Sequence, residues 1–478
     1  MTVVPALVVL VLIGQGCQSP PPPPRDYYFS PRGDDAAGAG TVEQPYRTIA
    51  RASALELNPG DRVLFEAGQT FTGSLKLDAR DAGTPGQPIT IGSYGAGRAT
   101  FEAGNATAVR VENAGGVRVA DLVMVGAGPR VNCGSGVEFV NSLPGGKKLR
   151  HVRVENVEAV GFGAEGVRVH GSPADGSPSG YDDVLVADCV ARENSHTGIY
   201  FTGWWKAERG RAPHAFAHSN VRVVRCLAQG NPGDPRARNS NRTGSGILLD
   251  SVNGAVIEYC EATDNGSDNY AKDGGPVGIW CTIANNVTIQ FCKSHRNSTA
   301  AGHDGGGFCL DGGVCNSVLQ YNASEENEGS GYGIYEYPGA TPAFGNIIRY
   351  NVSRNDGRKN GYAGIHVWDD ARTLRNVRIE GNLVYMDSAP PGEKPPRGMW
   401  LQSPIRDALI AGNVFSIVSG VRLMDVAGGQ RAVRFEHNAY HTGGDRIALE
   451  WEGREYTSLR AWLAETGQST PERRAGAE

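Results

Sequence analysis

The chain has 478 residues, and its 66 glycines amount to about 14%, twice the usual share of about 7%. No Gly-X-Y period accompanies them, which excludes collagen, and 40% apolar with 20% charged residues excludes a disordered chain. A net charge of −5 is too small to indicate a nucleic-acid partner or binding to an anionic membrane. Length allows two to four domains of roughly 100–200 residues, unless the chain is a solenoid with one continuous core.

The N-terminal segment is typical of an export signal followed by a spacer. The apolar run from Val3 to Ile13 has the length of a signal-peptide core and is too short to span a bilayer. Small residues precede Cys17, as in a bacterial lipoprotein signal, and an ordinary secretory signal is the alternative. Prolines 20–24 form a stiff spacer. We expect an exported protein, extracellular, periplasmic or on the cell surface, whose only membrane contact is a lipid on Cys17.

Helical caps are expected at both ends of the remaining chain. Pro45 is placed to open a helix that Asn58-Pro59-Gly60 ends, and Val63-Leu64-Phe65 starts the first strand. A helix over the end of a sheet covers its unpaired edge. The segment from Ser458 to Leu463 predicts a short amphipathic helix at the other end.

Between these caps runs a repeat of the form apolar-x-apolar-x-x-(Cys or Asn). From the first terminal residue to the last is 282 residues in nine steps, a mean of about 31, and a period of 20–50 residues indicates a solenoid. Val and Ile alternating with polar residues predict half-buried strands, and no step contains a convincing helix. The terminal residues are Asn156, Cys189, Cys226, Cys260, Cys292, Asn322, Asn351, Asn382, Asn413 and Asn438.

This Cys/Asn column is expected to occupy a stacked corner of the coils. An Asn side chain there can bond the backbone of its own turn and its neighbours in the next coils. A cysteine in the same place is a small buried hydrophobe. We therefore expect reduced, packed thiols, with a secreted disulfide framework as the alternative.

A second strand in each period begins at a glycine. Counting from that glycine, residues +1 and +3 share one face of the strand, and +2 and +4 share the other. Nineteen of the twenty +1 and +3 residues are apolar, with Glu336 as the exception, so this face is the core and coils stack about 4.8 Å apart. The heading glycines are Gly136, Gly166, Gly198, Gly246, Gly278, Gly307, Gly333, Gly364, Gly398 and Gly420.

With its N-terminal pattern (27–35, 44–49 and 58–61), the repeat resembles the right-handed parallel β-helix proteins of the pectate-lyase-like superfamily. The resemblance covers about residues 27–465 and implies an all-β solenoid of about ten or more coils, with an N-terminal capping helix and a short C-terminal helix. This fold hosts lyases, hydrolases, epimerases, adhesins and tailspikes, so it does not decide the activity. The expected segments are 1–24 (signal and spacer), 25–104 (cap and first strands), 105–445 (β-helix) and 446–478 (C-terminal cap and tail).

The outward face of the glycine-headed strands is rich in aromatic residues. Exposed rings along a rigid sheet can stack on sugar rings, because a pyranose presents an apolar C–H face. The alternative is that loops cover this face and the rings form a satellite core. The residues expected to bind a polysaccharide are Tyr200, Trp280, Tyr335, Tyr337, Trp368, Trp400 and His170.

Acidic residues on the same face are the catalytic candidates. Asp250 and Asp311 share the +4 position two coils apart, about 10 Å between backbones, near the roughly 6.5–9.5 Å carboxyl separation of an inverting glycosidase. Asp304 lies in the turn before the Asp311 strand, and we expect Asp304 and Asp311 to be the leading pair, in undetermined order. Glu336 is the alternate acid, either re-aimed outward by a β-bulge or buried and paired. His366, outward at +2, is expected to transfer protons or orient substrate.

A distant resemblance to family nine pectate lyases tests the lyase alternative. Asp311 stands where that family has its catalytic lysine, and Glu328-Gly329-Ser330-Gly331 replaces its calcium-binding Asp-Asp turn. Both departures argue against that mechanism. The oxygen-rich run 264–269 is a candidate Ca²⁺ loop, but runs of this kind more often form ordinary polar loops. We therefore assign no metal ligand and expect no cofactor to be required.

The sequence thus predicts a monomeric, exported β-helix protein that acts on a polysaccharide. Hydrolysis by paired carboxylates is the leading hypothesis. The alternatives are a lyase or C5-epimerase acting on a uronate polymer, and a surface protein that binds glycans without cleaving them.

Overall fold

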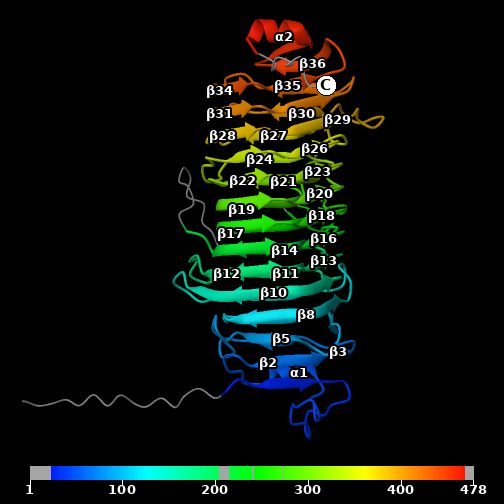
Figure 1. The fold of residues 1–478 in the computed structure, drawn as a ribbon, viewed down its shortest axis with the longest axis vertical. Helices are drawn as coiled ribbons and strands as arrows, with labels where there is room; N and C mark the ends of the chain where they lie inside the picture. The colour runs from blue at the N-terminus through cyan, green and yellow to red at the C-terminus, as the bar shows by residue number, and fades with distance from the viewer. Residues whose placement is uncertain (1–22, 204–214, 239–241, 273, 469–478) are drawn as a thin grey trace, which may run out of the picture.

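Three parallel sheets wind around one core to form a right-handed β-helix (Figure 1). The computed structural model describes residues 23–203, 215–238, 242–272 and 274–468. Each coil runs in turn through three sheets, called here the second sheet, the third sheet and the site sheet, and the site sheet is the one whose strands begin at the heading glycines. Strands β12 (Gly180–Ala187), β13 (Val190–Arg192) and β14 (Thr197–Gly203) form one such coil. The long strands β8, β10, β17 and β19 turn a corner and belong to two sheets. The expected export signal, with Cys17, lies outside the described residues.

The bounds of the strands follow the three sheets. The site sheet contains β4 (Leu75–Leu77), β7 (Val109–Glu112), β9 (Val137–Asn141), β11 (Glu165–Gly171), β14 (Thr197–Gly203), the first parts of β17 (Ser245–Glu258) and β19 (Val277–Gln290), β21 (Gly306–Asp311), β24 (Tyr332–Glu336), β27 (Ala363–Asp369), β30 (Arg397–Leu401), β33 (Arg422–Val426) and β36 (Arg446–Trp451). The second sheet contains β1 (Asp26–Phe29), β2 (Arg62–Glu66), β5 (Ile89–Tyr94), the first parts of β8 (Val117–Gly126) and β10 (Lys148–Val160), β12 (Gly180–Ala187), β15 (His218–Val224), the ends of β17 and β19, β22 (Val318–Gln320), β25 (Ile347–Arg349), β28 (Arg375–Glu380), β31 (Arg406–Ala411) and β34 (Arg431–Glu436). The third sheet contains β3 (Thr70–Thr72), β6 (Ala99–Gly104), the ends of β8 and β10, β13 (Val190–Arg192), β16 (Leu227–Gln229), β18 (Glu261–Thr263), β20 (Lys293–His295), β23 (Ala323–Glu325), β26 (Val352–Arg354), β29 (Leu383–Met386), β32 (Val414–Ile417) and β35 (Ala439–His441).

The predicted inward face of the site sheet is buried. The eight residues expected to form one stack are each at most 1% exposed, which confirms the face assigned to every one of these strands. They are Val167, Ile199, Ile247, Ile279, Phe308, Ile334, Ile365 and Met399.

The Cys/Asn column forms a continuous ladder at the corner between the second and third sheets. Asn322 donates through Nδ2 to Asn351 Oδ1 at 3.1 Å, and the pattern continues coil by coil to Asn438. In the N-terminal half the cysteines take these places, and the eight cysteines of the described residues are free thiols. Asn156 is a correction to this column: it is exposed, in the left-handed position opposite Asp188, and Val157 fills the buried rung instead.

A second ladder, which the sequence analysis missed, explains the heading glycines. It runs along the corner between the third sheet and the site sheet. A side chain at a heading glycine would collide with it: a Cβ at Gly278 would lie 2.7 Å from Asn297 Nδ2, and one at Gly307 would lie 3.0 Å from Asn327 Nδ2. The ladder residues are Asn194, Asn231, Asn265, Asn297, Asn327 and Asp356.

The ladder also corrects the predicted register of one coil. A Cβ at Gly331 would lie 2.5 Å from Asp356 Oδ2, so Gly331 is the heading glycine rather than Gly333. Ile334 therefore lies opposite Leu310, two residues from its predicted place, and keeps its inward face because strands have a period of two. Gly420 does not head its strand either, because Met424 lies opposite Met399.

Short helices cover both ends of the solenoid (Figure 1). Helix α1 spans Ile49–Ser53 with Thr48 as its N-cap, so it starts four residues after Pro45 and ends before the expected stop. The first strand is β1, which pairs in parallel with β2, not the segment at residues 63–65. At the other end β37 (Arg454–Ser458) pairs antiparallel with β36, and α2 (Leu459–Thr466) buries Trp462 completely, as the predicted C-terminal helix requires.

A charge in the inward stack tests this core. Ile247→Asp places an unpaired carboxylate among buried side chains of neighbouring coils, and we expect the protein to fail to fold or to lose cooperative unfolding by circular dichroism. Val352→Asp is the matched control, because Val352 is 41% exposed on β26. Equal melting temperatures for the two variants would contradict the assignment of the core.

Candidate active site

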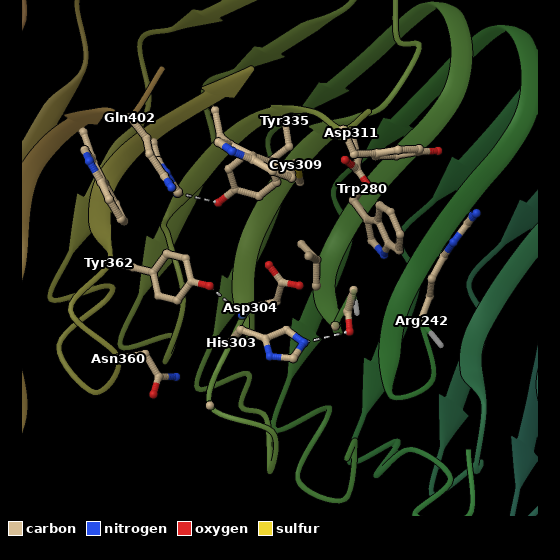
Figure 2. A pocket seen from close by; sticks show the side chains of 18 of the residues that line it. Arg242, Trp280, His303, Asp304, Cys309, Asp311, Tyr335, Asn360, Tyr362 and Gln402 are labelled. Carbon is tan, nitrogen blue, oxygen red and sulfur yellow. Dashed lines mark hydrogen bonds between the residues drawn. The ribbon is translucent and has the colours of Figure 1, made fainter. Parts of the chain in front are cut away.

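A cavity of about 1090 Å³ lies on the outward face of the site sheet, over strands β14 to β30 (Figure 2). It brings together nine of the residues expected from the sequence to bind or react. These are Tyr200, Trp280, Asp304, Asp311, Tyr335, Tyr337, His366, Trp368 and Trp400. The other three, His170, Asp250 and Glu336, do not line it.

Asp304 enters the cavity from the turn before β21. Its backbone is in the left-handed region, with φ of 56°, followed by Gly305 at 76°. Its backbone N–H donates to the Tyr362 hydroxyl at 3.1 Å, and its side chain packs on Gly275, where a Cβ would lie 2.6 Å from Asp304 Cβ. Gly275 thus leaves space for the carboxyl, which forms no ion pair with the described residues (Figure 2). Burial raises the pKa of Asp304.

Asp311 is the last residue of β21 and points outward, as its register predicts. It lies opposite Thr282, which in turn lies opposite Asp250, so the two aspartates are two coils apart as expected. Burial raises the pKa of Asp311 to about 6. The backbone N–H of Gly312, 2.8 Å from Oδ1, opposes this increase, and the charge of Asp304 adds to it. Asp304 is therefore close enough to influence the ionisation of Asp311.

Asp250 has a different role from the one expected. Its Oδ2 lies 3.0 Å from Arg242 Nη1, and its side chain is buried behind the cavity wall. Arg242 lines the cavity and faces the Trp280 ring, with its guanidinium carbon 5.9 Å from the ring centroid. Asp250 therefore balances the charge of a partly exposed arginine beside the reacting groups, and we place no catalytic step on it.

His366 is held in place by hydrogen bonds and stacking. Its Nε2 lies 2.8 Å from Gln402 Oε1 and its Nδ1 lies 3.2 Å from the Tyr335 hydroxyl. Because Gln402 Oε1 only accepts, Nε2 carries the proton and Nδ1 accepts from Tyr335. Burial lowers the pKa of His366 to about 3, so the ring is neutral. His366 thus orients Tyr335 at the cavity wall.

The aromatic rings expected to stack on a sugar are partly covered by contacts of this kind. Trp400 stacks on His366 at 4.5 Å between centroids, and the Arg397 guanidinium lies over its ring at 4.2 Å, so these contacts cover part of the ring. Trp280 is 2% exposed and packs against Leu248, Val277 and Cys309, which is the satellite core that the alternative interpretation described. The rings left partly exposed in the cavity are Tyr200, Tyr335, Tyr337, Tyr362, Trp368 and Trp400.

Glu336 and His170 lie outside the cavity. The corrected register places Glu336 opposite Asp369 at the end of β24, with no β-bulge, and its side chain is fully buried. Its Oε2 accepts from the Gly313 backbone N–H at 3.1 Å, while Oε1 has no partner. Burial raises the pKa of Glu336 to about 8, so it is protonated at neutral pH. His170 lies on β11 with a pKa that burial lowers to about 4.

Several cavity residues were missed because they precede the heading glycines. Tyr362 and Arg397 lie two and one residues before their glycines, as Asp304 lies three before Gly307. Lys272 and Lys394 are exposed at the cavity, where they form no ion pair with the described residues. The turn into each site strand therefore forms one wall, and the same positions could have been read from the repeat.

Two features of the described residues bear on metal binding and membrane insertion. No three His, Cys, Asp or Glu side chains in this part of the chain are arranged to hold a metal ion. Within the candidate calcium loop at residues 264–269, Asp264 pairs with Arg296 and Asp268 pairs with Arg130. No helix in the described part of the chain is long and apolar enough to cross a membrane.

Comparison with known proteins identifies the fold. A family model described as a right-handed beta helix region matches residues 236–389. A GH136 lacto-N-biosidase structure from Eubacterium ramulus aligns with 87% of this chain and 68% of that chain, at a TM-score of 0.59 and 19% identity. The fold is the right-handed parallel β-helix that the sequence predicts.

Two further similarities are more limited. Lacto-N-biosidase from Bifidobacterium longum is 39% identical over 72 residues, which are 14% of this chain and only 4% of the length of that protein. The structure of pectate lyase Pel9A covers 77% of this chain and 78% of that chain at 17% identity, with a TM-score of 0.43. These similarities do not decide which reaction this cavity supports.

The buried carboxyl of Glu336 predicts a pH-dependent stability. The folded-state pKa of about 8 lies above the ordinary 4.5, so the wild type loses stability as pH rises from 4.5 through 8, by a few kcal/mol. Glu336→Gln keeps the acceptor for Gly313 and has no proton to lose. We expect the variant to melt at a higher temperature than the wild type at pH 9 and at a similar temperature at pH 5. An unchanged difference between the two pH values would contradict this.

Two tryptophan variants distinguish core from platform. Trp280→Ala removes a buried ring whose Nε1 donates to Ser245 Oγ at 3.1 Å, and we expect it to cost about 3–5 kcal/mol of stability. Trp368→Ala removes a partly exposed ring and should leave the melting temperature within a few degrees of the wild type while weakening glycan binding. The measurements are thermal unfolding and binding isotherms, and equal stability losses would show that both rings are core.

Proposed function

We propose that this protein is a glycoside hydrolase that uses Asp304 and Asp311 on a glycan bound in the cavity. The observation that carries the proposal is the pair of carboxyls with raised pKa values in one cavity, neither of them in an ion pair with the described residues. An ordinary surface aspartate loses its proton near pH 4 and is ionised at neutral pH, whereas a general acid must keep its proton there. Partly exposed aromatic rings supply the stacking surface for a sugar.

The surroundings of the two carboxyls support different roles. Asp311 accepts a backbone N–H from Gly312 and is near Arg242, both of which favour its ionised form. No hydrogen bond comparably favours an ionised Asp304. We therefore assign Asp304 as the general acid that protonates the leaving oxygen. Asp311 is the ionised partner that attacks the anomeric carbon or activates water, as in other carboxylate pairs.

The similar proteins support hydrolysis over elimination. The two relatives at the highest similarity described above are both named lacto-N-biosidases. A lyase needs a base for a sugar C–H and a cation for the uronate. Lys272 and Lys394 at the cavity supply candidate cations, but the groups with raised pKa values are the two carboxyls, as hydrolysis requires. The lyase or C5-epimerase and the non-catalytic glycan-binding protein remain the alternatives. We also propose that the protein acts after export, as its N-terminal sequence predicts, and as a monomer.

Replacing each carboxyl by an amide tests the assignment. Asp304→Asn and Asp311→Asn should each lower the release of reducing ends from a cleaved glycan by about 10²–10⁴-fold, with unchanged melting temperature and binding. The wild type should show a bell-shaped kcat/KM with its acidic limb near pH 6, because Asp311 must lose its proton while Asp304 keeps its own. Asp311→Asn should remove that limb.

The control is Asp370→Asn, because Asp370 is exposed and does not line the cavity. Full activity in both amide variants would contradict the assignment. Products that absorb in the near ultraviolet would indicate elimination, and binding without new reducing ends would support the glycan-binding alternative.

A further inference from the structure

A column of three arginines runs along the second sheet, outside the cavity. Arg375 on β28, Arg406 on β31 and Arg431 on β34 lie directly opposite one another in successive coils. All three side chains are exposed, and none forms an ion pair with another described residue. Adjacent strands place them about 4.8 Å apart, and like charges directly opposite in a sheet are destabilising. The folded protein therefore keeps three arginines that repel one another, although a single acidic residue in this column would remove the repulsion.

The same column is complementary in earlier coils. Arg150 lies opposite Asp182 and forms an ion pair with it at 3.0 Å. Asn285 lies opposite Asn253 and donates to its Oδ1 at 2.8 Å. The column thus joins an ion pair and an asparagine pair in earlier coils, passes through Cys315 and Phe344, and ends in three cations. The missing anion is most simply a ligand.

A recess accompanies the arginines. A cavity of about 550 Å³ is lined by Arg406, Arg431 and the exposed Arg372, with Leu374 and Ile405 as its apolar part.

The neighbouring charges and rings leave this cationic surface free. Asp369, the carboxylate that lines this recess, is buried and accepts the backbone N–H groups of Thr373 and Leu374 at 3.2 and 2.9 Å, and the exposed Asp407 beside Arg406 forms no ion pair with the described residues. Asp370 accepts a hydrogen bond from Ser403 at 3.4 Å. The Arg375 guanidinium lies over the Phe344 ring at 4.8 Å, which holds the first member of the column in place.

We propose that this arginine column, with Arg372, binds an acidic polysaccharide through its carboxylate or sulfate groups. The planar guanidinium fork binds such groups through two parallel hydrogen bonds. The occupant is a glycan because the site continues from the catalytic cavity: residues 370–374 connect β27, whose Trp368 lines that cavity, to Arg375. A chain that leaves the cavity at this edge meets the arginines, so the choice of occupant rests on the proposed function.

Binding is measured on the Asp304→Asn protein, so that the probe is not cleaved and a failure of hydrolysis does not affect the result. The probes are polygalacturonate and heparin, with dextran as the neutral polymer and polyuridylate as the nucleic acid, in affinity gel electrophoresis at several salt concentrations. We expect retardation by an acidic polysaccharide, weakened by salt, and none by dextran. The triple variant Arg375→Gln/Arg406→Gln/Arg431→Gln should bind the acidic polysaccharide at least about tenfold more weakly.

The melting temperature provides a second measurement. Without ligand, the triple variant should melt at the same or a higher temperature than its parent, because it loses the repulsion between the arginines. Arg354→Gln is the matched control: Arg354 is exposed on β26 and already paired with Glu325 at 2.8 Å, so its loss should leave glycan binding unchanged. The proposal is overturned if neither acidic polysaccharide binds, if Arg354→Gln weakens binding equally, or if polyuridylate binds more tightly than both.

Discussion

The structure depends on one constraint: every coil stacks on its neighbours in register, about 4.8 Å apart. Each position must therefore be compatible with a near copy of itself above and below. Asparagine meets this condition because its amide both donates and accepts. The heading glycines meet this condition because the second ladder, from Asn194 to Asp356, occupies the space that their side chains would need. The same stacking brings outward residues of successive coils into one cavity wall, as with Asp311 and the ring of Tyr335, 24 positions apart.

The repeat predicted the fold because its signals are local and periodic. Alternating Val and Ile determine which face is inward, and that assignment survives even where the strand is displaced by two residues, as at Ile334. The displacement itself could not be seen, because Gly331 and Gly333 are two residues apart and only the contact with Asp356 distinguishes them. Asn156 was misplaced for a related reason: asparagine also favours the left-handed position beside the rung.

The cavity was predictable only in part. Register alone places Asp311 and Trp280 on the outward face, and both line the cavity. Register does not show what covers a side chain, so Trp280 is core and Trp400 is partly covered, although both were expected to be exposed. It also does not show which carboxylates are already paired. Asp250 and Asp311 share the same column, yet only Asp250 is bound to Arg242, and that contact comes from a residue eight positions earlier in a turn.

The second ladder, from Asn194 to Asp356, has a direction, and that direction explains its last residue. In every rung the side-chain Oδ1 accepts from the preceding coil, while Nδ2 donates to the following coil, as Asn297 does to Asn327 at 2.8 Å. The amide dipoles are thus aligned head to tail along the solenoid axis, with their positive ends toward the C-terminus. A group that accepts without donating onward ends such a chain with no donor left over. Asp356 takes both N–H groups of Asn327 on Oδ1 and the Ser353 hydroxyl on Oδ2, so a carboxylate terminates a polar filament that an amide would have left open.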